Sequence, residues 1–539
     1  MAHISAPGAA SLAQPLAAVD DNGSAAAAAA EDGSHHKDGT GAGAQSGAVE
    51  LTHPIVAYHL FALAVLVYAI VVVGGLTRLT ESGLSITEWN PGFKGMRLPT
   101  TDAEWHAEWD KYKLTPEFVL LNQRMSLEDF KSIYMWEWAH RVLGRVIGVA
   151  FALPALYFLA RPGWVAKGTR WKLLAIGGGI GFQGALGWFM VKSGLSDPTL
   201  KNASTQAQTL AQAEGTSPPI PSTGHSESKW TPRVSHFRLA AHLGTAFLVY
   251  LGMLHTGLNI LRDWKLAHGV GTVAGVPLQQ QSATPSASAS SSAPRQRVVA
   301  ALQNPLVRKY ARSVRHLTLF VFATAMSGAL VAGLDAGLIY NEWPTMGGEG
   351  RLAPPADELM NERYALRGGA SDAGDSNRNA GWRLWTGNVF HNPATVQLVH
   401  RTLATTSFLA VFALAWRTRS LRRALATAST PSSSAQRLST SLPPLIPRLS
   451  ALACGAVTLQ ASLGITTLLY LVPIPLASAH QAGSLALLSV LIALSAALHR
   501  PGAALVRAIE AGGSSSSPST LWREHVRGRA LARLAHAGP

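Results

Sequence analysis

The sequence predicts an all-α integral membrane protein with eight transmembrane helices, arranged as two pseudo-twofold-related four-helix bundles. Apolar residues make up 47% of the 539 residues, charged residues make up only 14%, and the mean hydropathy is positive, which is unusual for a soluble protein. Eight stretches approach or exceed the ~20 apolar residues that a helix needs to cross a bilayer. They are residues 54–76, 138–160, 171–191, 239–261, 317–334, 396–416, 449–472 and 479–498.

Charge placement predicts how these spans are oriented. The connections after spans two, four and six are basic, and the positive-inside rule places them in the cytoplasm or the mitochondrial matrix. Their cations include Arg161, Lys167, Arg262, Arg308, Arg312, Arg417 and Arg423. The segments after spans one and five are acidic and are expected outside, so an even number of spans leaves both termini inside. Membrane-flanking arginines explain the net charge of +15, and a nucleic-acid partner is not expected.

Composition divides the chain into five segments. Residues 1–52 are rich in Ala, Gly and Ser and are expected to be disordered. Residues 53–262 form the first four-helix half, 263–314 an inside-facing low-complexity linker, 315–499 the second half and 500–539 a tail. Low-complexity stretches at 202–231 and 271–297 are expected to be tolerated loop expansions. With Cys454 as the only cysteine, an intramolecular disulfide is excluded.

An internal repeat relates the two halves. The run Glu81-Ser-Gly-Leu, followed three residues later by Glu88-Trp, is matched at the same spacing by Asp335-Ala-Gly-Leu and Glu342-Trp. Because these acids occur in both halves, they are expected to order the outer loops rather than to perform chemistry. Parallel halves in one chain predict a pseudo-twofold axis along the membrane normal. The glycines near the helix ends, among them Gly74, Gly187 and Gly328, are expected to allow close helix packing.

Four histidines occupy matching positions in the repeat. His140 and His242 lie in spans two and four, and His400 and His480 lie in spans six and eight. Ionisable or ligating groups at membrane depth are costly and usually mark function. Imidazoles that face each other from neighbouring helices can hold a heme iron from both sides. The sequence therefore predicts two heme sites, both toward the outer face, where these spans begin.

One acid distinguishes the two predicted sites. Glu137 precedes His140 by three residues and shares its helix face, whereas the matching position in the second half is Gln397. A carboxylate there could stabilise positive charge on a substrate carbon, accept its proton or position water. Arg141 and Arg401, which follow the leading histidines, are candidate contacts for heme propionates; a role as interface anchors is the open alternative.

Several motifs occur in order along the eight spans. They are GGLTRLTESGLS at 74–85, EWAHRVLG at 137–144, GWFMVKSGL at 187–195, RLAAHLG at 238–244, SGALVAGLDAGLIY at 327–340 and HQAGSL within 475–485. Together they resemble the heme A synthase family of the mitochondrial and alphaproteobacterial type, and the resemblance covers all eight spans.

The resemblance implies an oxidoreductase that converts the methyl group of heme O to the formyl group of heme A for cytochrome c oxidase. It implies a bound heme b on one histidine pair and the substrate heme on the other. The implied partners are heme O synthase, an electron-transfer protein such as ferredoxin, cytochrome oxidase assembly factors, the lipid bilayer and a second copy of the chain. The implied location is the mitochondrial inner membrane, or the plasma membrane in a bacterium.

A second function remains open at this stage. A two-heme electron-transfer cytochrome, linked to a quinone or ferredoxin and without heme-modifying activity, would explain the four histidines equally well. Only the enzyme accounts for the unmatched Glu137, and on that basis the first half is assigned the substrate site, on His140 and His242. The second half is assigned heme b, on His400 and His480.

Overall fold

The computed structural model describes residues 49–90, 92–194, 234–279, 293–348, 350–366, 380–427 and 441–511. All of them belong to one compact unit, Ala48–Pro539. The sequence predictions for residues 1–48, 202–231, 280–292 and 512–539 lie outside the described residues.

Eight long helices confirm the predicted all-α membrane class. Each is long and apolar enough to cross a membrane. They are α1 (Pro54–Leu79), α4 (Leu127–Ala160), α5 (Lys167–Gly194), α7 (His236–His268), α9 (Pro305–Gly333), α12 (Pro393–Thr427), α13 (Leu445–Leu469) and α14 (Ile474–Ala497). The only strands in the described part of the chain are β1 (Thr272–Val273) and β2 (Val276–Pro277), which pair antiparallel.

Helix α4 begins earlier than the sequence predicts. Its first residue is Leu127, whereas the apolar stretch begins at Trp138. Ser126 and Asp129 form a capping box at this end, which satisfies free backbone N–H groups. The helix has 34 residues, or about 51 Å at 1.5 Å per residue, against a hydrocarbon core of about 30 Å. Its first turns therefore extend past the apolar span into the outer segments.

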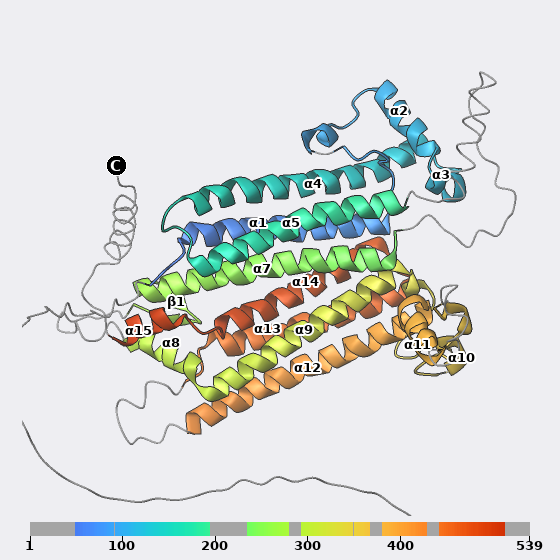
Figure 1. Cartoon of the computed structure of the whole chain (residues 1–539). Coiled ribbons are helices and arrows are strands. Elements are labelled where there is room, and N and C mark those ends of the chain that lie inside the picture. Colours follow the sequence, from blue (N-terminus) through green and yellow to red (C-terminus); the bar gives the residue numbers. More distant parts are fainter. Residues whose placement is uncertain are drawn as a thin grey trace, which may run out of the picture. The chain divides into compact units, whose positions relative to one another are not determined.

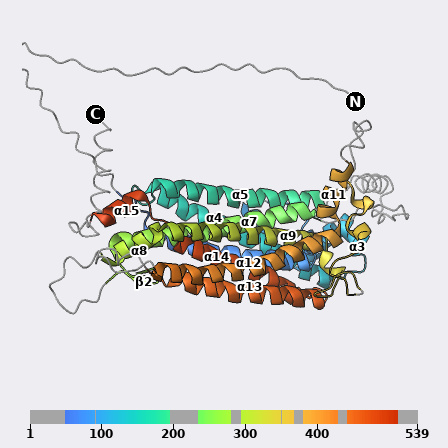
Figure 2. The same ribbon diagram turned by 90° about the horizontal axis from the view of Figure 1, so that it is seen from below.

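The acidic segments of both halves lie at the same end of the long helices, which we call the outer end. Figure 1 shows α2, α3, α10 and α11 there, with α8 and α15 at the opposite, inner end, and Figure 2 agrees. The short outer elements are η1 (Gly92–Met96), α2 (Asp102–Lys113), α3 (Pro116–Leu121), η2 (Ala336–Leu338), α10 (Ala356–Leu359), η3 (Glu362–Tyr364) and α11 (Ala380–His391). This placement agrees with the predicted topology, in which spans one and five are followed by segments on one side.

The two halves repeat the same helix pairings. In the first half, α1 and α5 each contact both α4 and α7; in the second, α9 and α13 each contact both α12 and α14. Between the halves, α1 contacts α14, α9 contacts α7, and α7 contacts α14. The repeat extends to backbone conformation, because Glu81 and Asp335 both adopt a left-handed φ, of 54° and 50°.

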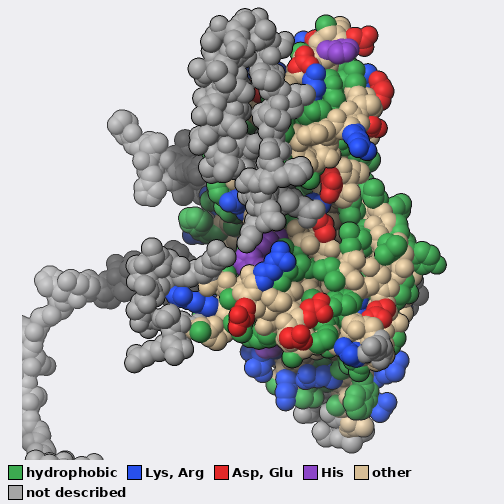
Figure 3. Space-filling view, turned by 90° about the vertical axis from the view of Figure 1, so that its right-hand side faces the viewer, with side chains coloured by type: hydrophobic (Ala, Val, Ile, Leu, Met, Phe, Trp, Pro, Cys, Tyr) green, Lys and Arg blue, Asp and Glu red, His purple; other side chains and the backbone are tan. Residues whose placement is uncertain are grey.

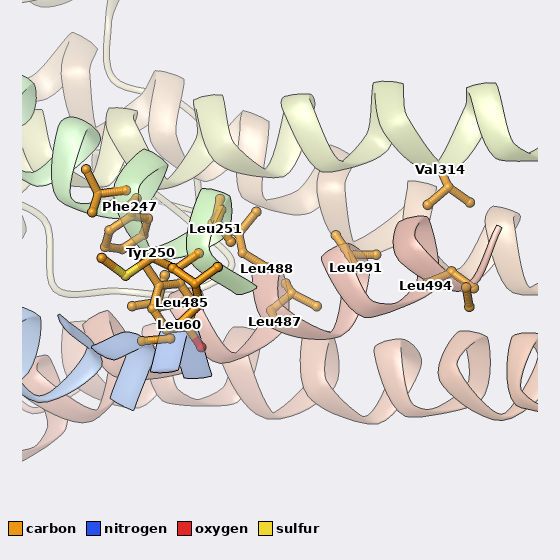
Figure 4. Close-up of a cluster of buried hydrophobic side chains, with 14 of the residues drawn as sticks. Leu60, Phe247, Tyr250, Leu251, Val314, Leu485, Leu487, Leu488, Leu491 and Leu494 are labelled. Carbon is orange, nitrogen blue, oxygen red and sulfur yellow. The ribbon is translucent and has the colours of Figure 1, made fainter. Parts of the chain in front are cut away.

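The two halves share one apolar core. Leu60 of α1, Phe247 of α7, and Leu485 and Leu488 of α14 are each 0% exposed, and Figure 4 shows them gathered between these helices. Polar contacts cross the same boundary: the Arg78 guanidinium pairs with Asp335 at 2.7 Å at the outer end. Together these contacts hold the histidine-bearing helices in register.

The inner end carries a second, smaller apolar cluster. Helices α8 (Ala293–Gln303) and α15 (Ala503–Glu510) pack with the β1–β2 turn. Val273, Val298, Leu302 and Leu505 are each at most 4% exposed in this cluster. Within residues 263–314, which composition predicts to be a linker, both described ends are therefore folded, because their apolar residues find partners on α15.

Candidate functional site

The first histidine pair faces across α4 and α7. The ring centroids of His140 and His242 are 6.4 Å apart, with their planes at 66°. If one metal ion is bound by both rings through bonds of about 2 Å, the centroids lie about 6 Å apart. The spacing therefore fits a shared metal, and two opposed imidazoles are a recognised axial pair for heme iron.

The second pair comes from α12 and α14. The two rings, of His400 and His480, lie near enough for their positive charges to repel each other. The Ser327 hydroxyl lies 2.8 Å from Nδ1 of His400, and the Gln460 amide nitrogen lies 3.1 Å from Nδ1 of His480. A histidine that binds metal through Nε2 usually donates the hydrogen of its other ring nitrogen to an acceptor. The Ser327 hydroxyl can accept this hydrogen from His400, whereas the amide nitrogen of Gln460 only donates. The contact at His400 therefore fits a metal ligand.

A glycine of a neighbouring helix lies against each of the four rings. An added methyl group would meet Cε1 of the ring at 2.8 Å for Gly74 and His140, 3.6 Å for Gly187 and His242, 2.9 Å for Gly328 and His400, and 2.7 Å for Gly464 and His480. Three of these distances are shorter than ordinary van der Waals contact. Gly74, Gly187 and Gly328, which were predicted to serve helix packing, thus also make room for the imidazoles, and Gly464 does the same in the second half.

Glu137 is buried and fully engaged. Its side chain is 4% exposed, and one carboxylate oxygen accepts hydrogen bonds from the Ser85 hydroxyl at 2.6 Å and the Ile86 N–H at 2.7 Å. The other oxygen accepts from Nε and Nη2 of Arg141 at 3.1 and 2.7 Å. The carboxylate therefore joins α4 to the outer loop after α1, one turn from His140.

The matching site of the second half lacks this ion pair. Gln397 donates to the Tyr340 carbonyl at 3.1 Å, and Arg401 donates to the carbonyls of Tyr340 and Thr345, each at 2.9 Å. In each half, the outer loop after the first helix is thus bonded to the helix that carries the leading histidine. A carboxylate and an arginine make these bonds in the first half, and an amide and an arginine make them in the second. The difference between the halves is the buried negative charge.

The two arginines predicted to contact propionates hold the outer loops. Arg141 donates to the carbonyls of Ile86 and Glu88 at 2.9 and 3.0 Å. A cavity of about 240 Å³ lies beside it and is lined by Arg145, Tyr134 and other polar side chains. Figure 3, which looks onto the outer end, shows acidic and basic side chains gathered there among apolar ones.

Two of the acids shared between the halves order the loops, as predicted. One oxygen of Glu342 accepts the N–H groups of Gly347 and Gly348 at 2.6 and 2.8 Å, which lowers the pKa of Glu342. Asp335 pairs with Arg78 of the other half at 2.7 Å.

Sequence reasoning missed Glu117, in α3. It is 5% exposed, and in the described part of the chain its Oε2 has no hydrogen-bond partner. Burial in the aromatic cluster around Tyr112 and Phe118, followed by repulsion from Glu137, raises the pKa of Glu117 to about 8. A glutamate in an otherwise ordinary Thr-Pro-Glu helix start gives no sequence sign of burial. Ser85 and Ser327 were missed for the same reason.

Most of the chain is similar to one family of proteins. A family model named COX15-CtaA, described as cytochrome oxidase assembly protein, matches residues 57–492. The heme A synthase COX15 of Saccharomyces cerevisiae is 40% identical over 83% of this chain and 76% of its own length. The heme A synthase of Rhodospirillum centenum is 35% identical over 81% and 86%.

A relative in Schizosaccharomyces pombe is named as a fusion. The heme A synthase-mitochondrial ferredoxin fusion protein is 39% identical over 82% of this chain. The chain spans 60% of the length of that relative.

Proposed function

The chain belongs to the COX15-CtaA family of heme A synthases, and from this premise we propose that it oxidises the methyl group of heme O to the formyl group of heme A, using the first histidine pair as the substrate site. The observation that carries the site assignment is the unmatched carboxylate. Glu137 is buried one turn from His140, where the second half has Gln397. Chemistry that only one half performs needs a group that only one half has.

In this proposal His140 and His242 hold the iron of the substrate from opposite sides. Their helices fix the depth of the macrocycle, and Gly74 and Gly187 allow the rings to lie close to α1 and α5. Oxidation of the methyl group takes electrons from it, which pass to the electron-transfer partner; this loss builds positive charge on the methyl carbon and releases protons. A preorganised buried carboxylate stabilises such charge without reorganising water.

Glu137 serves as this carboxylate. It is held by four hydrogen-bond donors in the structure described above, which fix its position and direction. When it accepts a proton from the substrate, its bond to Arg141 weakens, and Arg141 keeps its bonds to the Ile86 and Glu88 carbonyls. Proton transfer thus leaves the outer loop attached to α4.

In the second half, we assign a resident heme b to His400 and His480. When bound, this group supplies one-electron redox chemistry that links the substrate site to an outside partner. His400 and His480 would hold this group, in a site where position 397 is an amide and not a carboxylate.

Buried arginine donors near both sites suit the propionates. Nε of Arg401 and Nη1 of Arg145 are buried and have no partner within the described residues. Carboxylates satisfy such donors well. We therefore assign Arg401 to a propionate of heme b, and we add Arg145 to Arg141 as a contact for the substrate.

The proposed setting is the mitochondrial inner membrane, with the basic loops and both termini in the matrix and both heme sites toward the intermembrane space; in a bacterium it is the plasma membrane. The fusion with ferredoxin in one relative favours ferredoxin as the electron-transfer partner. Heme O synthase, cytochrome oxidase assembly factors and a second copy of the chain are further proposed partners.

The test is heme extraction from cells that make heme O, with and without this chain. Chromatography of the extracts should show heme A only when the chain is present. If heme O stays unchanged while the purified protein carries two hemes b, the chain is an electron-transfer cytochrome and the proposal is wrong.

A further inference from the structure

The two histidine pairs differ in what contacts Nδ1. In the second half, a serine hydroxyl lies 2.8 Å from Nδ1 of His400, and an amide nitrogen lies 3.1 Å from Nδ1 of His480. In the first half, Nδ1 of His140 and Nδ1 of His242 are both buried and have no side-chain partner in the described part of the chain. The difference lies in the neighbouring helices, because the histidines themselves match.

Ser327 determines the tautomer of His400. Its hydroxyl donates to the Thr324 carbonyl at 2.7 Å, which uses the single hydroxyl hydrogen. The oxygen of Ser327 can then only accept from Nδ1 of His400, 2.8 Å away. With its proton on Nδ1, the imidazole presents the lone pair of Nε2 to a metal, and the hydrogen bond makes the ligand more basic.

The repeat places a residue without a hydroxyl at the matching position. Gly74 and Gly328 contact His140 and His400 in the same way, so Val73 corresponds to Ser327. Valine has no side-chain acceptor. A backbone acceptor is present in both halves, the Ile70 carbonyl for His140 and the Thr324 carbonyl for His400, so the difference between the halves is the serine hydroxyl.

The matching glutamines provide no acceptor at Nδ1. Gln183 and Gln460 match in sequence, and their amide nitrogens donate to the His242 and His480 carbonyls at 2.8 and 2.9 Å. The Gln460 amide nitrogen also lies 3.1 Å from Nδ1 of His480, but an amide nitrogen is a donor and cannot accept the Nδ1–H of a metal-bound imidazole. Within the described residues, the side-chain acceptor at Nδ1 is therefore particular to His400.

We propose that Ser327 is a positioning residue that makes the second heme site retentive, and that Val73 leaves the first site able to exchange its heme. This inference rests on the proposed function for the need to exchange, since a resident group must stay and a product must leave. Loss of such a partner typically costs 10–100-fold in metal affinity. That range is enough to separate a retained group from an exchanging one.

The test compares Ser327→Val, Ser327→Thr and Val73→Ser with the wild type. The Ser327 variants and their wild-type control are purified from cells that make heme b but no heme O, so neither readout depends on heme A formation. The first readout is the rate at which heme b passes to an excess of a heme-scavenging globin. The second is the reduction potential of the bound heme.

Ser327→Val should release heme b roughly 10–100-fold faster and should shift its reduction potential upward, because a less basic imidazole stabilises ferric iron less. Ser327→Thr keeps the hydroxyl and should behave like the wild type, which a role in space filling alone would not predict. Retention and potential unchanged in Ser327→Val would overturn the proposal.

The reciprocal variant tests the first site. For this variant and its wild-type control, the protein is purified from cells that make heme O. Val73→Ser should slow the release of heme O and heme A from the pair His140 and His242 by a similar factor, and unchanged release would overturn the part of the proposal that concerns Val73. Because both readouts are independent of turnover, a chain that makes no heme A could still show the Ser327 effect. The two proposals can therefore fail separately.

Discussion

Replacing Glu137 by glutamine separates the chemical role of the carboxylate from its structural one. Breaking a buried ion pair can cost 3–5 kcal/mol when one charge is left unpaired, and the side chains of Glu137 and Arg141 are only 4% and 9% exposed. The second half shows how an amide replaces the carboxylate: Gln397 donates to the Tyr340 carbonyl, and Arg401 is held by backbone carbonyls. Glutamine at 137 can make the matching bond to the Ile86 carbonyl.

We therefore expect Glu137→Gln to fold, with a stability loss of about 1–3 kcal/mol from the weakened acceptor for Ser85 and Ile86. The heme b spectrum should persist. Heme A formation should fall far more, because losing about 3 kcal/mol of transition-state stabilisation lowers a rate more than a hundredfold.

The assay is the ratio of heme A to heme O in cell extracts, normalised to the heme b held by the purified variant. Gln397→Glu is the matched control and should change this ratio little, because the proposed function assigns only electron transfer to that site. Normal heme A formation by Glu137→Gln would refute the reasoning and would leave the assignment of catalysis to the first half without support.

Three further predictions follow from the described contacts. Gly74→Ala should lower heme A formation strongly, because the new methyl group meets the His140 ring at 2.8 Å, whereas Gly148→Ala, with nothing within 4 Å, should leave it unchanged; equal effects would contradict the contact. Glu117 has its pKa raised from 4.5 to about 8 by burial, so the folded protein holds a proton that the unfolded chain releases. The stability from Glu117 is thus complete below the unfolded pKa and is lost as pH rises through the folded one. In detergent, the unfolding free energy of the wild type should fall by up to a few kcal/mol more than that of Glu117→Gln between about pH 5 and pH 9, and its Tm should fall more as well. Parallel pH profiles of the two proteins would exclude a buried protonated Glu117. Protease added to mitoplasts from the intermembrane-space side should leave residues 271–297 intact, and cleavage there would reverse the proposed orientation.

Hydropathy and the repeat predicted the eight helices because burial in lipid leaves a long apolar signature that needs no knowledge of tertiary contacts. The histidine positions were predictable for a similar reason, since a ligating side chain in an apolar run stands out. The extra turns of α4 before Trp138 were not predicted. This polar segment packs against α2 and η1 at the outer end, and its hydropathy is as low as that of a loop.

The supporting contacts could not be read from the sequence. Ser85, Ser327 and Glu117 are ordinary residues whose importance comes from what the fold places beside them. The close approach of Gly74 to His140 likewise depends on how α1 packs against α4. The chain pattern identifies the candidate ligands, and the packing identifies the side chains beside them.

The central claim is that the two histidine pairs hold different hemes. The most direct measurement is the heme composition of wild type, His140→Ala and His400→Ala, each purified from cells that make heme O. His400→Ala should lose most of its heme b, whereas His140→Ala should keep heme b and lack heme O and heme A. If His400→Ala keeps its full heme b, or if both variants lose the same heme to the same extent, the assignment of a resident and a substrate site is wrong.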